Sequence, residues 1–257
     1  MKISVVMAAY NSQATIGEAI ESFLAQDHPE KELIVIDGAS QDDTRSIVEG
    51  FSSPAIRFLS ERDKGIYDAL NKGIALAEGD VVGLLHTDDL FARKNVLSRV
   101  AEALGSGEVD GAYGDLEYVA RDRPSSVIRY WRAGAYSRDL LRKGWMPPHP
   151  TLFLRSGVFE KHGNYDVSFR ISADYEAILR WLTKAELQLA YIPEVLVRMR
   201  VGGESNRSLG RIIRKSREDL RAIRRHGIGG CGVLLAKNAS KLGQFTSRDG
   251  YQDMKDN

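Results

Sequence analysis

The sequence predicts an α/β fold in which a mostly parallel sheet is flanked by helices and followed by a helical C-terminal appendage. Three observations predict this class. Short apolar runs recur along residues 1–89, and segments with apolar residues at helical spacing alternate with them. Such alternation is typical of a doubly wound parallel sheet. It fades after residue 89, and the last part of the chain is rich in arginine.

The elements follow from these patterns in chain order. We expect strands at residues 3–8, 33–36, 56–59 and 81–85, with helices at 15–25, 43–51 and 66–77. Further on we expect helices at 96–104 and 138–143, a helix opening within 171–176, and strands at 111–119, 127–131, 187–192 and 195–199. A basic amphipathic helix follows at 207–225 and a shorter one at 233–242. The simplest organisation is one domain over residues 1–205 and a C-terminal extension over 206–257.

Composition limits the classes of function. The 257 residues are 43% hydrophobic and 28% charged, and the net charge of +1 gives no argument for a nucleic-acid partner. The lone Cys231 excludes an internal disulfide and suits a reducing compartment. The N-terminal apolar run is too short for a signal peptide, and no apolar stretch approaches the length of a membrane span. We therefore expect a cytoplasmic protein.

Polar residues follow three of the expected strands directly. Asn11 follows the first strand, Asp37 ends the second, and Asp88 and Asp89 follow the strand at 81–85. Singly, each is as well explained by a helix cap or a turn. Because the carboxyl ends of parallel strands share one edge, where ligands bind in open α/β sheets, together they favour a site. No GxGxxG follows the first strand and no GxxxxGK[ST] occurs, so a dinucleotide site and a P-loop are not supported.

Three later segments carry candidate residues. His149 lies among prolines in the sequence PPHPT, which fixes its backbone, although an ordinary loop histidine fits equally well. Asp174 lies in the first turn of a predicted helix, where a purely structural acid is also favoured. Residues 198–205 read as a basic, glycine-containing turn that suits a phosphate or serves as a simple turn.

Taken together, the motifs resemble a known family. The segments SVVMAAYNS, VIDGAS, SERDKGIYDALNKGIALAEGD, HTDD, PPHPT and SADYE occur in the order found in family 2 glycosyltransferases of the GT-A fold. The resemblance covers about residues 1–205, and it is greatest to bacterial enzymes that build exopolysaccharide, colanic-acid-like polymer or lipopolysaccharide O-chains. No single motif is specific to the family, but the set is.

The resemblance implies roles for individual residues. Base and ribose of the nucleotide would be held by Ala9, Tyr10, Asn11 and Asp37, and the pocket would be closed by Asp63, Lys64 and Gly65. Thr87 and Asp88 would contact the nucleotide, and Asp88 and Asp89 would hold Mn²⁺ or Mg²⁺. His86 departs from the family pattern, because it stands where the first acid of a DxD motif would be. Asp174 matches the catalytic base, and the diphosphate or acceptor region would include His149, Arg198, Arg200 and Ser205.

The chemistry of glycosyl transfer agrees with these residue types. Carboxylates select hard divalent ions, which stabilise a leaving diphosphate. A separate carboxylate is needed to take the proton of the acceptor hydroxyl. We expect an inverting enzyme that uses a nucleotide-sugar donor, with UDP the commonest carrier in the family, and a glycan or lipid-linked oligosaccharide acceptor in the synthesis of bacterial cell-surface polysaccharide.

Three rival functions remain at this stage. A sugar nucleotidyltransferase would normally have a glycine-rich basic loop after the first strand, where this chain has Ala9-Tyr10-Asn11. A glycosidase could use Asp88 and Asp174 but leaves Asn11 and Asp37 unexplained. A non-catalytic nucleotide-sugar binding module would use the same fold. The basic helix at 207–225 has two interpretations of equal weight, peripheral contact with an anionic membrane surface on the inner face of the plasma membrane or packing on the main domain.

Overall fold

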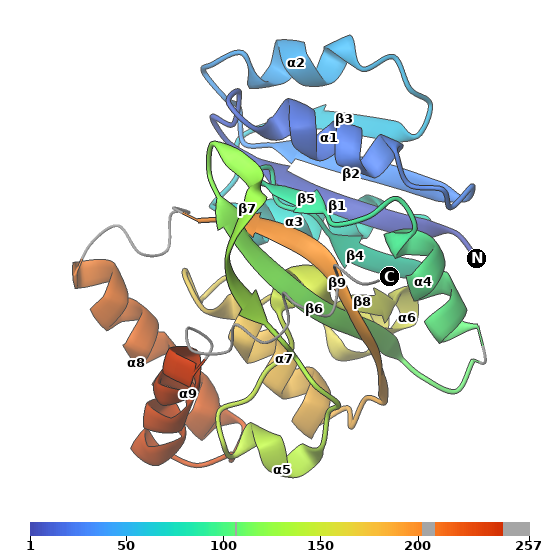
Figure 1. The fold of residues 1–257 in the computed structure, drawn as a ribbon. Helices are drawn as coiled ribbons and strands as arrows, with labels where there is room; N and C mark the ends of the chain where they lie inside the picture. Colours follow the sequence, from blue (N-terminus) through green and yellow to red (C-terminus); the bar gives the residue numbers. More distant parts are fainter. Residues whose placement is uncertain (106, 202–208, 244–257) are drawn as a thin grey trace.

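In a computed structural model that describes residues 1–105, 107–201 and 209–243, one mixed sheet lies at the centre of the molecule, with helices on both sides (Figure 1). The strand order is β3-β2-β1-β4-β8-β6-β9-β5, and β7 pairs with β6 off this path. Strands β1 to β4 run parallel to one another, whereas β8 is antiparallel to both β4 and β6. The predicted alternation of strands and helices therefore builds the parallel half of the sheet.

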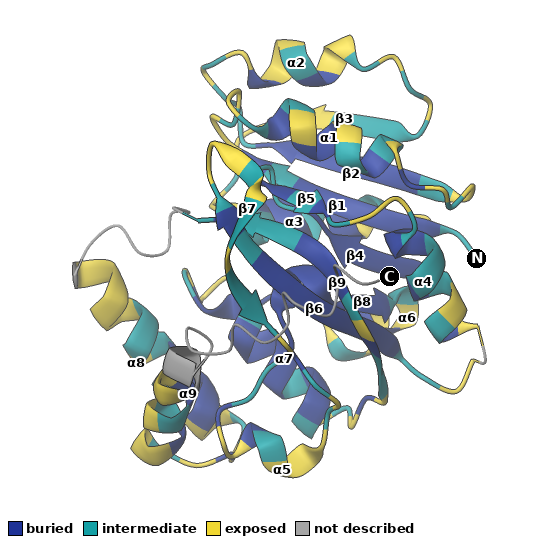
Figure 2. Cartoon of the chain, viewed as in Figure 1, coloured by how far each residue is buried: buried dark blue, intermediate teal, exposed yellow. Residues whose placement is uncertain are grey.

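The N-terminal half matches the expected elements closely. In chain order they are β1 (Ile3–Ala9), α1 (Ile16–Leu24), β2 (Lys31–Asp37), α2 (Thr44–Gly50), β3 (Ile56–Ser60), α3 (Ile66–Leu76), β4 (Val81–Leu84), β5 (Asp89–Phe91) and α4 (Val96–Leu104). Strands β1, β2 and β4 are buried along almost their whole length (Figure 2), as their continuous apolar runs predict.

The second half completes the sheet and covers it. It contains β6 (Gly111–Ala120), β7 (Arg123–Trp131), α5 (Arg138–Leu141), the 3₁₀ turn η1 (His149–Thr151), β8 (Phe153–Arg155), α6 (Ser156–His162), α7 (Ala173–Thr183), β9 (Leu189–Arg200), α8 (Leu209–Arg225) and α9 (Cys231–Gly243). Helix α7 is almost wholly buried, and α8 and α9 pack beside it at the C-terminal end (Figure 1).

Two glycines allow the close packing of this core. A Cβ on Gly73 of α3 would lie 2.3 Å from Val6 of β1. A Cβ on Gly83 of β4 would lie 2.1 Å from the ring of Phe153, which is fully buried. Helix α3 and strand β8 can therefore approach the central strands only because these positions lack a side chain.

Several expected boundaries were wrong, for identifiable reasons. The two strands expected at 187–192 and 195–199 are one strand, β9, whose pairing with β6 shifts register around Pro193. Arg198 and Arg200 lie in this strand rather than in a turn. The strand expected at 127–131 is longer, because β7 begins at Arg123. Helix α6 and the three-residue β5 were not predicted.

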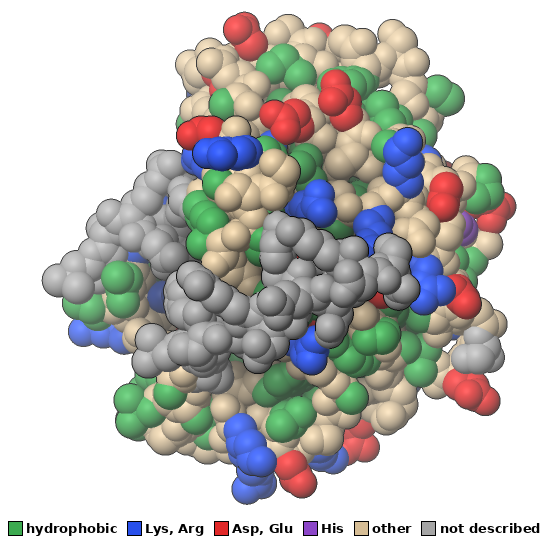
Figure 3. All heavy atoms as spheres, viewed as in Figure 1, with side chains coloured by type: hydrophobic (Ala, Val, Ile, Leu, Met, Phe, Trp, Pro, Cys, Tyr) green, Lys and Arg blue, Asp and Glu red, His purple; other side chains and the backbone are tan. Residues whose placement is uncertain are grey.

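No helix within residues 1–105, 107–201 and 209–243 combines the length and the apolar character that crossing a bilayer requires. On the face shown in Figure 3, acidic and basic side chains are interspersed and do not form a field of one sign. This distribution agrees with the near-zero net charge of the sequence.

Candidate functional site at the carboxyl edge of the sheet

The first part of the site is the edge where the parallel strands end. Ala9 of β1 is paired with Asp37 of β2, and Asp37 with Ser60 of β3, so the three strands end side by side. Tyr10, the first residue after β1, is 63% exposed. An exposed aromatic ring next to a buried carboxylate suits a flat ligand that also offers hydrogen-bond donors.

Asp37 is held rigidly at this edge. Its side chain is fully buried and accepts hydrogen bonds from the backbone N–H of Ser40, at 3.1 Å, and from the hydroxyl of Ser60, at 2.6 Å. The hydroxyl of Ser40 also donates to it. The hydrogen bonds satisfy a carboxylate that would otherwise be costly to bury.

Asn11 and Asp63 border the same edge. Asn11 has a positive φ of 47°, and its side-chain oxygen accepts a hydrogen bond from the N–H of Gln41 at 2.9 Å. A Cβ on Gly38 would lie 2.5 Å from a carboxylate oxygen of Asp63 and 3.3 Å from the Tyr10 ring. The loop before α3 is thus brought against the ends of β1 and β2, and only glycine fits between them. Asp63 in turn accepts a hydrogen bond from the N–H of Gly65 at 2.8 Å.

The loop after β4 carries the HTDD sequence to this edge. The hydroxyl of Thr87 donates a hydrogen bond to that of Ser12 at 3.0 Å, which joins the loop to the segment after β1. Asp88 is partly exposed, whereas Asp89 is completely buried at the start of β5. Arg200 of β9 is itself buried and donates a hydrogen bond to the carbonyl oxygen of Asp88 at 3.3 Å.

Asp89 has an unusual environment for an acid. Neither of its carboxylate oxygens has a hydrogen-bond partner in the structure of the described residues. Burial, reinforced by the charge of Asp88, raises the pKa of Asp89 well above its usual range, although Arg200 partly opposes the shift. A buried carboxylate without hydrogen-bond partners, beside a second and partly exposed one, is what a hard divalent cation would neutralise.

The oxygen atoms of this loop could bind a cation only together with donor atoms of a bound substrate. Among the described residues, no group of three or more histidine, cysteine, aspartate or glutamate side chains could enclose a metal ion. Mg²⁺ in particular is usually bound by one or two carboxylates together with substrate phosphates and water. The HTDD loop fits that donor set.

Asp174 reaches the same site from the other half of the chain. It lies in the first turn of α7, and one of its carboxylate oxygens accepts a hydrogen bond from the hydroxyl of Tyr67 at 3.1 Å. Asp88 and Asp174 are both close enough to His86 for their charges to oppose the effect of burial, which lowers the pKa of that histidine. The ring of His86, in the HTDD loop, is thus close to both Asp88 and Asp174.

His149 lines the same region beneath His86. The two ring centroids are 6.2 Å apart, and the Nε2 atom of His149 is 2.9 Å from the hydroxyl of Tyr165. Burial lowers the pKa of His149 to about 4, His86 adds to the shift, and Asp174 opposes it. Both histidine rings are therefore neutral at physiological pH.

The structure thus gathers most of the predicted residues at one edge, but not all of them. Arg198 pairs with Glu117 on the neighbouring strand at 3.2 Å. The side chain of Arg200 supports the HTDD loop through the backbone carbonyl of Asp88. Lys64 is exposed in the loop before α3. Ser205 lies outside the described residues, so its predicted role has no structural counterpart here.

Sequence reasoning did not single out two tyrosines of the site. Tyr67 lies in the segment KGIYDAL, and Tyr165 lies before α7. A tyrosine in the first turn of an otherwise small and apolar helix face is a weak signal, and its partner Asp174 is 107 residues away. Only the tertiary approach of α3 and α7 reveals this contact.

Comparison with known proteins places this geometry in context. Residues 4–163 match the family model described as glycosyl transferase family 2. The chain is 35% identical over 181 residues to an uncharacterized glycosyltransferase of Mycobacterium tuberculosis, covering 69% of this chain and 68% of that protein. It is 31% identical over 208 residues to a PGL/p-HBAD biosynthesis glycosyltransferase of Mycobacterium bovis, covering 79% of this chain and 78% of the relative.

Solved structures agree on the fold. S. aureus TarS 1–349 in complex with UDP-GlcNAc gives a TM-score of 0.66 at 18% identity, covering 89% of this chain and 66% of that one. The chain covers only 43% of a longer TarS structure. The mannosyltransferase PcManGT from Pyrobaculum calidifontis, in complex with GDP-Man and Mn2+, gives 0.66 at 18% identity, covering 92% and 68%. These similarities confirm the predicted GT-A fold, and the sequence matches show that the chain belongs to glycosyltransferase family 2.

Proposed function

We propose that this protein is an inverting glycosyltransferase that moves a sugar from a nucleoside diphosphate donor to a hydroxyl of a glycan or lipid-linked acceptor. One observation carries the proposal. The carboxyl edge that carries Tyr10, Asp37 and Asp88 also carries His86, and Asp174, from the other half of the chain, lies close enough to His86 to act on its charge, as Asp88 does. Donor binding and base catalysis need two such separate groups in one site.

The nucleoside would bind where β1 and β2 end. The exposed ring of Tyr10 offers a stacking surface for the base. Asp37 is fully buried and held by Ser40 and Ser60, so it would accept hydrogen bonds from the ribose only in exchange for those of the two serines. Asp63 lies next to Gly38 on the same side. UDP is our first expectation for the carrier. The bound donors of the structural neighbours, UDP-GlcNAc in TarS and GDP-Man in PcManGT, support this class of ligand.

The diphosphate would lie at the HTDD loop. Asp88, with the buried Asp89 behind it, would hold Mn²⁺ or Mg²⁺, and Arg200 would keep the loop in place through the Asp88 carbonyl. When bound, the cation would supply Lewis-acid stabilisation of the leaving diphosphate. The neutral rings of His86 and His149 border this region and bring no positive charge of their own.

Asp174 would act as the general base. The Tyr67 hydroxyl occupies one side of its carboxylate, which leaves the second oxygen for the acceptor hydroxyl. Asp174 would take the proton as the acceptor oxygen attacks the anomeric carbon from the face opposite the nucleotide, in a single displacement that inverts the configuration. His149, with Tyr165, would line the acceptor side.

Two measurements test this proposal. Calorimetric titration with UDP, GDP and dTDP, with and without Mn²⁺, should show one preferred nucleotide whose affinity rises with the metal and falls in Asp88→Ala. Hydrolysis of UDP-GlcNAc, UDP-glucose and GDP-mannose, with water in place of the acceptor, should release a sugar of inverted configuration by NMR. Asp174→Asn should abolish hydrolysis and keep nucleotide affinity.

The rival functions predict different results. A sugar nucleotidyltransferase would release pyrophosphate from a nucleoside triphosphate and a sugar phosphate. A binding module would bind the nucleotide but hydrolyse none of the donors, with or without Asp174. Absence of binding to all three nucleotides would refute the proposal as a whole.

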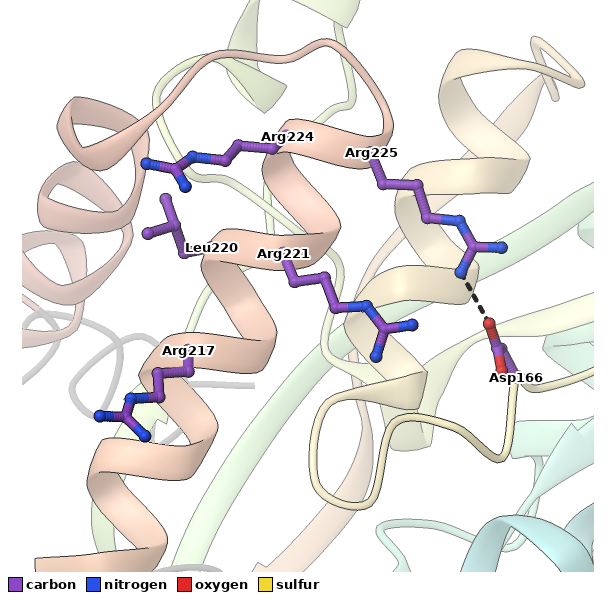
Figure 4. A pocket seen from close by; sticks show the side chains of 6 residues that line it. All are labelled: Asp166, Arg217, Leu220, Arg221, Arg224 and Arg225. Carbon is purple, nitrogen blue, oxygen red and sulfur yellow. Dashed lines mark hydrogen bonds and ion pairs between the residues drawn. The ribbon is translucent and has the colours of Figure 1, made fainter.

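The acceptor side includes a basic surface on α8 that suits an anionic membrane. Residues Ile213, Arg217, Leu220 and Arg224 recur at helical spacing along one stripe of the helix. Ile213 is 47% exposed, and among the described residues no carboxylate forms an ion pair with Arg217 or Arg224. Figure 4 shows the side chains of Arg217 and Arg224 pointing away from that of Arg225, which pairs with Asp166 at 2.7 Å. These residues line one open groove along α8. Arginine alternating with aliphatic side chains is typical of helices that lie on acidic bilayers.

Vesicle binding tests the membrane contact. Each basic residue near an acidic bilayer contributes about 1 kcal/mol, so Arg217→Gln/Arg224→Gln should weaken binding to phosphatidylglycerol-containing vesicles about 30-fold at low salt. The control Lys161→Gln/Lys184→Gln removes the same charge from α6 and the end of α7. An unchanged partition coefficient, or an equal loss in the control, would contradict the assignment to α8.

A further inference from the structure

The segment that precedes α7 is held by an acid from the C-terminal appendage. The carboxylate of Glu218, on α8, accepts hydrogen bonds from the N–H groups of Ile171 at 2.8 Å and Ser172 at 3.0 Å. It also accepts one from Arg170 at 3.2 Å. Ser172, the N-cap residue of α7, makes no capping hydrogen bond with its own side chain. From a distant helix, Glu218 therefore holds the three consecutive backbone N–H groups that lead into α7.

The same peptide is held from the opposite side by α3. The hydroxyl of Tyr67 lies 2.7 Å from the carbonyl oxygen of Ile171 and 3.1 Å from the carboxylate of Asp174. The N–H of Ile171 thus faces α8 while its carbonyl faces α3. Since Asp174 follows three residues later, in the first turn of α7, its position depends on both contacts.

Buried polar contacts near Glu218 hold α8 against α7 and α9. Asp219, 1% exposed, pairs with Lys237 of α9 at 2.8 Å and with Lys215 at 3.1 Å. Just beyond the end of α8, about two turns from Glu218, His226 lies 2.9 Å from the fully buried Glu176, which follows Asp174 by two residues. A slip of α8 would break the contacts with Lys237 and Glu176 together, so Glu218 has little freedom to move away.

We propose that Glu218 is a positioning residue for catalysis, which holds the start of α7 so that Asp174 meets the acceptor hydroxyl in a productive geometry. This inference rests on the proposed role of Asp174 as the base. It also gives the C-terminal extension a part in the reaction, although α8 lies beyond the residues that match the family model. Displacement of a catalytic group by about 1 Å can lower a rate 100-fold.

The test compares Glu218→Ala and Glu218→Gln in the full chain, with the exposed Glu160→Ala on α6 as the matched control. Hydrolysis of UDP-GlcNAc, UDP-glucose and GDP-mannose, calorimetric affinity for the nucleotide and Tm are measured on each variant. We expect Glu218→Ala to lower kcat about 10- to 100-fold while nucleotide affinity stays within twofold, because the donor pocket lies at the ends of β1 and β2. Glu218→Gln, which keeps one acceptor oxygen and the size of the side chain, should lie between Glu218→Ala and wild type.

A readout that needs no substrate accompanies the kinetics. Hydrogen exchange of the peptide that spans residues 170–176 should be faster in Glu218→Ala and unchanged in the control.

The outcomes separate this inference from the proposed function. An inactive Asp174→Asn together with a fully active Glu218→Ala would overturn the positioning role alone. A parallel fall of kcat and nucleotide affinity would show a general structural role instead and would also overturn it. An Asp174→Asn variant as active as wild type, or a wild type that hydrolyses none of the donors, would overturn the proposed function itself.

Discussion

Acid should destabilise this protein through His149, at a pH where its surface carboxylates are still ionised. The side chain of His149 is 7% exposed and lies against His86 and Tyr165. Burial lowers its pKa from 6.5 to about 4, so the ring stays neutral in the folded protein while it becomes protonated in the unfolded chain.

The sign and size of the effect follow from these two values. Below pH 6.5 the unfolded chain binds a proton that the folded protein does not, so the free energy of unfolding decreases as pH falls. The stabilisation is fully present above pH 6.5 and is lost as pH falls toward 4. Between pH 7.5 and 5.0, the loss attributable to His149 alone is about 2 kcal/mol.

Urea denaturation at pH 7.5 and 5.0 measures this loss. His149→Gln removes the titrating ring, so its free energy of unfolding should depend on pH less than that of wild type, by about 2 kcal/mol over this interval. The partly exposed His162 on α6 provides the control, and His162→Gln should keep the pH dependence of wild type. An unchanged pH dependence in His149→Gln would refute the argument, whatever the stability of the variant at pH 7.5.

Three further predictions concern packing, nucleotide binding and the metal. Gly83→Ala should lower the free energy of unfolding by about 1–3 kcal/mol in urea denaturation, because its Cβ would overlap the buried ring of Phe153, whereas Gly50→Ala, with open space at the Cβ, should not. Tyr10→Ala should weaken UDP binding by about 1–3 kcal/mol in calorimetry through lost stacking, with no change in Tm, since this ring is 63% exposed. Removal of divalent cations with EDTA should lower UDP affinity in wild type but not in Asp88→Ala; equal affinity before and after EDTA in wild type would contradict metal use.

The parallel half of the fold could be predicted because each of its strands and helices is specified by the pattern of residues within its own segment. Strands β1, β2 and β4 are short apolar runs, buried almost throughout, and each is bounded by turn residues. Strand β9 was divided in the prediction because Pro193 interrupts its pattern, yet β6 pairs along both parts through a shift of register. Strand β5 has only three residues and forms because β9 lies beside it, which no local pattern could reveal.

The site was predictable to the same extent and for the same reason. Asp37 and the HTDD loop follow strands whose direction is known, so topology alone brings them to one edge. Tyr67 and Glu218 follow no such rule, since their partners lie 104 and 46 to 48 residues away and the contacts depend on how helices α3, α7 and α8 pack. Basic periodicity of α8 predicted an amphipathic helix but left open what it contacts.

The two faces of α8 differ in what they contact: one packs against α7, and the other is a basic stripe that we propose contacts a membrane. Asp219, Ala222 and Ile223 are buried, and Glu218 holds the segment that leads to Asp174. The stripe of Ile213, Arg217, Leu220 and Arg224 is left for an acidic surface. The two uses are compatible, because residues on different faces of one helix can contact α7 and a bilayer at the same time. If both proposals hold, an acceptor presented at a membrane would meet a base whose position is set by the helix nearest to that membrane. Vesicles should then raise kcat in wild type and leave the rate of Glu218→Ala unchanged, a comparison that tests the coupling directly.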